Sequence, residues 1–198
     1  KAFERIGFKD AIVVKQQPDD ATWDAADTPY NTIRWFAGVD ASFAIGPSRA
    51  NPFTGEIYDA DISVSDGIIR NARRGGEELV APTLPSSPAG LWGESSDQSR
   101  FACDYADGLA HQAAFGFAVL EANAALSPEV ETRLMREYVV DLIAHEVGHT
   151  LGLRHNFRAS TMLTLADLHD LGKTTQLGQS GSVMDYNPAL FFTERPLE

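Results

Sequence analysis

The hydrophobic residues in the first third of the chain are spaced mainly as in β-strands. Ile33 and Trp35 alternate with polar residues, as do Ile62 and Val64, and such alternation is typical of half-buried strands. Glycine and proline residues mark the turns between these runs. Four strands are therefore predicted, at residues 11–16, 31–36, 41–45 and 56–65, with a short helical turn at 2–8 before them and a tight turn at 51–55.

The second half of the chain has a helical pattern. A helix is predicted over residues 102–124, with a buried face formed by Tyr105, Leu109, Phe117 and Leu120. A second helix has Ser127 as its N-cap and Pro128 at its first position, and it ends at Gly152. Its apolar stripe consists of Val130, Leu134, Tyr138, Leu142 and Ile143. Between strands and helices, residues 74–100 are expected to form a long loop, and a short helix is expected near residues 165–171.

The composition is that of an ordinary globular domain with an excess of acidic residues. Of the 198 residues, 43% are hydrophobic and 22% are charged, and a chain of this length can bury a core without disulfides. The 28 acidic and 16 basic residues give a formal net charge of −12. Because binding to phosphates needs clustered Lys and Arg, neither a nucleic acid nor an anionic membrane surface is an expected partner. No apolar run of about 18 residues predicts a membrane span, and the single Cys103 is expected to be a small hydrophobic residue.

Three of the five histidines fall within one short motif, HEVGHTLGLRH, at residues 145–155. On a helix, His145 and His149 project from the same face, so both imidazoles can approach one ion. Gly152 permits a left-handed backbone where the chain leaves the helix, after which His155 can fold back as a third ligand. Three nitrogen ligands and one open position are typical of a single catalytic zinc ion, whereas structural zinc has four protein ligands. Glu146, about 100° further around the helix, can reach a metal-bound water without being a ligand itself.

Plainer explanations remain for the individual residues of such a motif. Two histidines four positions apart are more often surface or packed residues than metal ligands. The added glycine and third histidine, however, make the eleven-residue motif specific for a metal site. The other two histidines, His111 and His169, are expected to be solvated or packed. A calcium site is a weaker candidate: it would use Asp59, Asp61 and Asp66, which lack the spacing of an EF-hand loop, so the sequence gives calcium no firm support.

Residues 145–186 resemble the metzincin clan of zinc metallopeptidases. The long histidine motif followed by a turn that contains methionine is the signature of that clan, and the sequence SVMDY at residues 182–186 resembles this Met-turn. The resemblance implies that Met184 lies beneath the imidazoles as an apolar surface. It also implies that Tyr186 joins the zinc or hydrogen-bonds the tetrahedral intermediate. A gap-filling core methionine and a tyrosine packed at a turn are the plainer alternatives.

The segments KAFE, YNTIRW and NPFTGEI, upstream of this motif, are similar to the catalytic domain of large bacterial zinc-dependent metalloproteases with uncharacterised flanking domains. The fold expected from this resemblance is α+β: a twisted mixed sheet with an antiparallel edge strand, a long active-site helix with a second helix beside it, and a small irregular C-terminal lobe. One catalytic domain would span 1–198, with the sheet and active-site helix in 1–152 and the third ligand and Met-turn in 153–198. Residues 70–128 match no part of the family pattern and are expected to be an insertion. The chain is expected to be part of a longer, secreted or periplasmic protein.

The function that the resemblance implies is zinc-dependent endopeptidase activity, in which Glu146 activates the zinc-bound water. A peptide or protein substrate would lie extended along a rim formed by Ala41, Ser42, Phe43, Ala44 and Ile45. Pro188 and Leu190 would belong to the wall of the main specificity pocket, although ordinary packing near the C-terminus explains them equally well. Two alternatives stay open: a catalytically silent module that binds peptides or proteins, which the intact Glu146 disfavours, and a zinc amidase acting on a non-standard peptide. The oligomeric state is not predicted.

Overall fold

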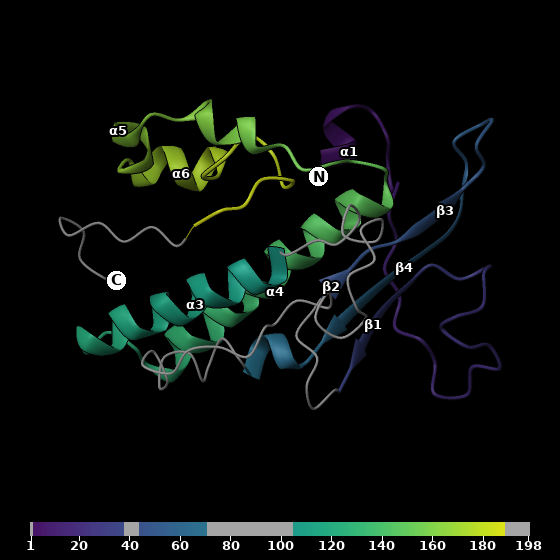
Figure 1. The fold of residues 1–198 in the computed structure, drawn as a ribbon, viewed down its shortest axis with the longest axis horizontal. Coiled ribbons are helices and arrows are strands. Elements are labelled where there is room, and N and C mark those ends of the chain that lie inside the picture. Colours follow the sequence, from purple (N-terminus) through teal and green to yellow (C-terminus); the bar gives the residue numbers. More distant parts are fainter. Residues whose placement is uncertain (1, 38–43, 71–104, 189–198) are drawn as a thin grey trace, which may run out of the picture.

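The computed structural model describes residues 2–37, 44–70 and 105–188 (Figure 1). Strands predominate before residue 66 and helices after it, as the hydrophobic pattern predicts. Residues 67–70, which follow the last strand, are also helical. The remaining elements are α1 (Ala2–Arg5), β1 (Thr32–Phe36), β2 (Ala44–Ile45), β3 (Ser48–Ala50), β4 (Ile57–Ser65), α3 (Tyr105–Ala122), α4 (Pro128–Thr150), the 3-10 helix η3 (Phe157–Met162), α5 (Leu165–Leu168) and α6 (Leu171–Leu177).

A mixed sheet forms around β4. Strand β1 runs parallel to β4, with Thr32 opposite Asp61 and Trp35 opposite Val64. Strands β2 and β3 pair with β4 antiparallel, so β2 is an edge strand on the side opposite β1. The hairpin between β3 and β4 closes at the predicted tight turn, where the N–H of Gly55 donates to the carbonyl of Asn51 at 2.8 Å.

Helix α4 begins and ends at the positions that its sequence predicts. The Ser127 hydroxyl accepts a hydrogen bond from the N–H of Val130, and Pro128 is the first helical residue. At the other end, Gly152 has a φ of 82°. The N–H groups of Gly152 and Leu153 donate to the carbonyls of His149 and Gly148, which is the pattern of a Schellman motif. The chain therefore reverses directly after the second histidine of the motif.

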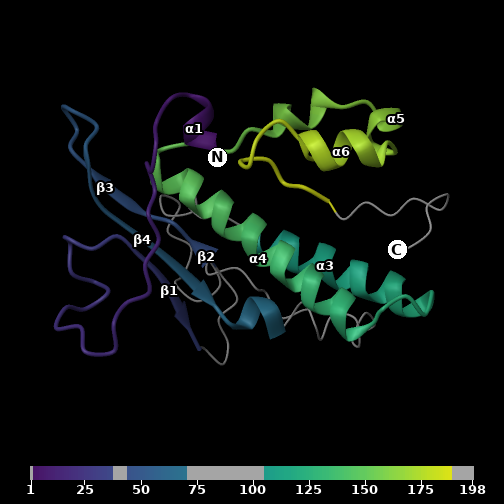
Figure 2. The same cartoon turned by 180° about the vertical axis from the view of Figure 1, so that it is seen from behind.

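The hydrophobic core lies between the sheet and the helices α3 and α4. Figures 1 and 2 show the two helices side by side, and α4 contacts both β4 and β2. Ile62 and Val64 on β4 are 3% and 1% exposed, and Leu142 on α4 is fully buried. Trp35 shares the inner face of the sheet with Val64 but is 50% exposed, because β1 lies at the sheet's edge. The predicted buried face of α3 is confirmed for Tyr105, Leu109, Phe117 and Leu120.

The segment after Gly152 lies on the other side of α4 from the sheet (Figures 1 and 2). The short helix expected near residues 165–171 is present as two helices, α5 and α6. A capping box between Thr164 and Asp167 starts α5, so local hydrogen bonds rather than an apolar core define this helix. No helix in the described ranges is long and apolar enough to cross a membrane.

The strand predicted at residues 11–16 is wrong. These residues form no strand, and Val13 and Val14 are 66% and 80% exposed. Side chains branched at Cβ favour extended backbone, but a strand also needs a neighbour for its hydrogen bonds. No strand in the described ranges pairs with this segment. Conversely, β3 was not predicted because its three residues are all exposed and show no apolar alternation.

The α+β class is confirmed by the mixed sheet, its antiparallel edge strand and the long helix α4. The division into two lobes at residue 152 stays a prediction. Some predictions fall on residues outside the described ranges. These residues are Ala41, Ser42 and Phe43 of the rim, the loop at 74–100, Cys103, and Leu190.

Replacing Gly152 by alanine is expected to destabilise the protein by about 1–2 kcal/mol, since a residue with a Cβ pays that amount in left-handed backbone. A Cβ at Gly152 meets no atom within 4 Å, so the cost is one of backbone strain alone. The matched control is Gly108→Ala in α3, which also has open space around it and a helical backbone. This variant should gain about 0.5–1 kcal/mol. Urea unfolding of both variants measures the difference, and equal effects would contradict the account of the Gly152 turn.

Candidate metal centre

The side chains of His145, His149 and His155 meet at the C-terminal end of α4. Their possible ligand atoms all lie within 4.8 Å of one another, and the Nε2 atoms of His149 and His155 are 3.1 Å apart. Two nitrogens bonded to one tetrahedral metal ion at about 2.0–2.1 Å would be about 3.3 Å apart. In the described part of the chain, this triad is the group of His, Cys, Asp and Glu side chains that could hold a metal ion. The structure thus brings together all three residues that the motif singles out.

Two backbone carbonyls orient the imidazoles of the helical pair. The Nδ1 of His145 lies 2.8 Å from the carbonyl oxygen of Val183, and the Nδ1 of His149 lies 3.0 Å from that of Leu153. A carbonyl oxygen only accepts hydrogen bonds, so each Nδ1 carries the proton and each Nε2 keeps its lone pair. Burial also lowers the pKa of His145 to about 4, which keeps this imidazole neutral. Neutral imidazoles with Nδ1 bonded to the protein are the form in which histidine binds metals.

Glu146, the residue directly after His145, is fully buried. Neither oxygen of its carboxylate has a hydrogen-bond partner among the described residues. Burial raises the pKa of Glu146 to about 7. Burying a carboxylate without a hydrogen-bond partner lowers the stability of a fold. The contacts of Glu146 within the protein therefore do not explain its presence, and a functional role does.

Gly46, directly after β2, allows the edge strand to approach α4 at Glu146. A Cβ at this position would lie 2.5 Å from the carbonyl oxygen of Glu146 and 3.2 Å from its Oε2. Any larger residue would push the two elements apart. The neighbouring predicted rim residues are placed as follows: Ala44 is fully buried, and Ile45 is 40% exposed. Binding of substrate along this rim stays a prediction.

The turn at residues 182–186 packs against α4 through Met184. A Cβ on Gly148 would lie 2.2 Å from the Sδ of Met184, so only glycine permits this contact. The turn is also held from the other side: the N–H of Asn156 donates to the carbonyl of Met184 at 2.9 Å, and the Ser160 hydroxyl donates to Asp185 at 2.6 Å. Met184 is 2% exposed and makes an apolar contact next to the histidine pair.

Tyr186 lies beside the third histidine. Its hydroxyl is 3.3 Å from the Nε2 of His155, and the two rings meet edge to face, with centroids 4.9 Å apart. The ring of Phe157 contacts both, with centroids 5.5 Å from His155 and 5.0 Å from Tyr186. Phe157 is 57% exposed, so it forms an apolar border at the surface of the site.

Sequence reasoning missed two residues of the site, Tyr105 and Asp141. The Tyr105 ring stacks on His145 with centroids 4.1 Å apart, and its hydroxyl donates to the Asp141 carboxylate. Burial raises the pKa of both groups, and the carboxylate beside Tyr105 raises that of the phenol further. Asp141 precedes His145 by one helical turn, and this spacing could have indicated that Asp141 lies on the same face of α4 as the site. Tyr105 had no such signal, because the pattern of α3 marks it only as core.

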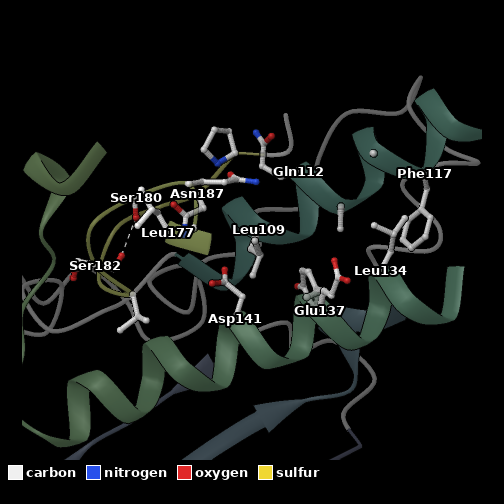
Figure 3. Close-up of a pocket in the computed structure, with 17 residues that line it drawn as sticks. Leu109, Gln112, Phe117, Leu134, Glu137, Asp141, Leu177, Ser180, Ser182 and Asn187 are labelled. Carbon is white, nitrogen blue, oxygen red and sulfur yellow. Dashed lines mark hydrogen bonds between the residues drawn. The ribbon is translucent and has the colours of Figure 1, made fainter. Parts of the chain in front are cut away.

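A cavity of about 500 Å³ lies between α3, α4 and the segment around the Met-turn (Figure 3). The helices contribute Leu109 and Leu134, and Asp141, one helical turn before His145 on α4, also lines the cavity. Pro188, predicted as part of a specificity wall, lines this cavity together with Asn187. The cavity is thus bounded in part by the segment that the resemblance assigns to a pocket wall.

The remaining candidates do not join the site. Asp59 pairs with Arg49, Asp61 accepts from Thr32, and Asp66 pairs with Arg70. These three carboxylates do not form one ligand group in the part of the chain that the structure describes, so calcium gains no support. His111 and His169 are both exposed and belong to no metal-ligand group in the described ranges.

The donor set fits zinc. Three imidazoles whose ring nitrogens lie within 4.8 Å of one another are ligands that zinc prefers. The buried carboxylate of Glu146, one position from the first ligand, is the additional group found where zinc sites are catalytic.

A comparison with known families agrees with this assignment. A family model described as Met-zincin matches residues 127–195. The match includes α4, the three histidines and the turn with Met184, and it confirms the resemblance to metzincin-type zinc metallopeptidases for this segment. No curated protein and no solved structure matches the chain.

Replacing Gly148 by alanine is expected to lower the free energy of unfolding by about 1–3 kcal/mol, the usual cost of overpacking. The reason is the collision of the new Cβ with the Met184 sulfur. The control is the same substitution in a Met184→Ala background, where the cost should largely disappear. Urea unfolding after removal of metal by a chelator measures this cycle. An equal loss of stability in both backgrounds would show that Met184 does not limit the size of the side chain at position 148.

Proposed function

We propose that this protein, whose residues 127–195 match the Met-zincin family, is a zinc-dependent endopeptidase with Glu146 as its general base. The observation that supports this proposal best is the combination of two features at one place. The ring nitrogens of three histidines lie within 4.8 Å of one another, and Glu146, the residue after the first of them, has a buried carboxylate without a hydrogen-bond partner among the described residues. A purely structural metal site needs the first feature but has no use for the second.

The chemistry of the chain's own groups follows from this arrangement. His145, His149 and His155 would hold the zinc ion. When bound, zinc polarises the scissile carbonyl and lowers the pKa of water toward about 7. Glu146 would accept the proton of the attacking water on a carboxylate oxygen and then deliver it to the departing amine. A group with a pKa near 7 suits both transfers at neutral pH, and burial moves Glu146 toward that value.

Tyr186 is the candidate for stabilising the negative charge that develops on the carbonyl oxygen. Its hydroxyl, 3.3 Å from the Nε2 of His155, is close enough to the ligand atoms to donate a hydrogen bond to a group bound there. The contacts of its ring with His155 and Phe157 limit the directions in which this hydroxyl can point.

For the substrate we assign an extended peptide beside the edge strand β2, which is held against α4 at Gly46. The cavity between α3, α4 and Pro188 would receive one substrate side chain (Figure 3). Its lining by Leu109, Leu134 and Phe117 favours an apolar side chain. A secreted or periplasmic location, as the resemblance implies, is part of the same proposal.

The test is cleavage of a mixed peptide library by the zinc-loaded protein, with products identified by mass spectrometry. Glu146→Gln and Glu146→Ala should each retain one zinc ion per chain but lose at least about 100-fold in cleavage rate, because a general base contributes 10²–10⁴-fold. The matched control is Glu121→Gln, which changes an exposed carboxylate on α3 and should alter neither quantity.

Undiminished cleavage by the Glu146 variants would remove this residue from the role of base. Wild-type protein that binds peptides with zinc present but never cuts them would favour the silent binding module. Cleavage limited to amides of modified side chains or of non-standard peptides would favour the amidase.

A further inference from the structure

Tyr105 lies against the metal centre although the proposed reaction does not use it. It is the first residue of α3, and only 1% of it is exposed. Its ring is stacked on the imidazole of His145 at an interplanar angle of 26°, and its centroid lies 4.8 Å from that of Tyr186. One aromatic ring therefore contacts both a predicted metal ligand and the predicted catalytic tyrosine.

The side chain of Tyr105 joins two further segments of the chain. Its hydroxyl donates a hydrogen bond to the carboxylate of Asp141, one turn before His145 on α4. Its ring contacts that of Tyr186 at the end of the Met-turn. The side chain thus links α3, α4 and the Met-turn.

The contact with Tyr105 adds to the other interactions that orient His145. The hydrogen bond from Nδ1 to Val183 holds one edge of the imidazole, and the rings of His149, His155 and Tyr186 have their centroids 4.8, 5.2 and 5.8 Å from it. The Tyr105 ring is stacked on the face of the imidazole and so opposes a tilt of the imidazole plane. Because metal ligands bind best when their orientation is set in advance, such a contact strengthens binding without contributing a ligand atom.

We propose that Tyr105 is a positioning residue of the zinc site: its ring, stacked on His145, fixes the plane of that imidazole. The proposal rests on the zinc site of the proposed function. It does not depend on whether the protein cleaves peptides.

A general packing role is the competing explanation. Tyr138 already links α4 to α3 through a hydrogen bond of 3.5 Å from its hydroxyl to the carbonyl of Ala106. If Tyr105 only joined these two helices, its loss should resemble the loss of any other buried residue of α3. Leu120 is such a residue: it is 7% exposed and lies about four turns further along α3, about 22 Å from Tyr105.

The experiment measures zinc affinity by competition with a chromophoric chelator, at neutral pH, for the wild type and three variants. Tyr105→Met fills much of the space but removes the flat ring and the hydroxyl, and it should weaken zinc binding about 10- to 100-fold. Tyr105→Phe restores the ring and should return the affinity to within about threefold of the wild type. Leu120→Ala, the packing control, should leave zinc affinity unchanged even where urea unfolding shows it to be less stable.

Zinc affinity of Tyr105→Met within threefold of the wild type would overturn the proposal, as would equal weakening in Leu120→Ala. If Tyr105→Met does not fold, Tyr105→Phe decides: a folded Phe variant with tenfold weaker zinc binding would overturn the role of the ring, and wild-type affinity would support it. A wild-type protein that binds zinc but does not cut peptides would contradict the proposed function and leave this result standing.

Discussion

The hydrogen bond between Nδ1 of His145 and the carbonyl oxygen of Val183 joins the two parts of the chain on which the metal centre depends. It connects the C-terminal part of α4 to a turn 38 residues later in the sequence. The bond can form only if that turn lies directly against α4. Gly148 provides the necessary space, since any side chain there would occupy the position of the Met184 sulfur. Packing at Gly148 and the hydrogen bond at Nδ1 therefore together orient the imidazole of His145, which leaves its Nε2 for the metal.

The rest of the fold holds the Met-turn and the third histidine against α4. The sheet packs on one side of α4 and the segment with η3, α5 and α6 lies on the other (Figure 1). The Schellman motif at Gly152 reverses the chain, so that His155 returns to the pair on the helix. Asn156 and Ser160 then hold the Met-turn by hydrogen bonds to Met184 and Asp185. Each of these interactions is short-range, and together they leave three imidazole nitrogens facing one another.

The sequence predicted the site better than it predicted the sheet. Helix periodicity and fixed spacing determine where His145, Glu146 and His149 project, and Gly152 marks the reversal that returns His155. Strand pairing depends on distant partners, so the apolar run at 11–16 looked like a strand although no described residue pairs with it. Tyr105 was missed for the same reason. Its contacts are with His145, Asp141 and Tyr186, which tertiary packing alone brings together.

The central claim is that one zinc ion is bound by three imidazoles and by no other protein group. The most direct measurement is a crystal structure of the zinc-loaded protein with anomalous scattering data collected on both sides of the zinc absorption edge. The account predicts one zinc peak at about 2.0–2.1 Å from the Nε2 atoms of His145, His149 and His155, with the remaining position open to solvent. A fourth protein ligand, such as Glu146 or Tyr186, or a zinc peak at other residues would contradict it.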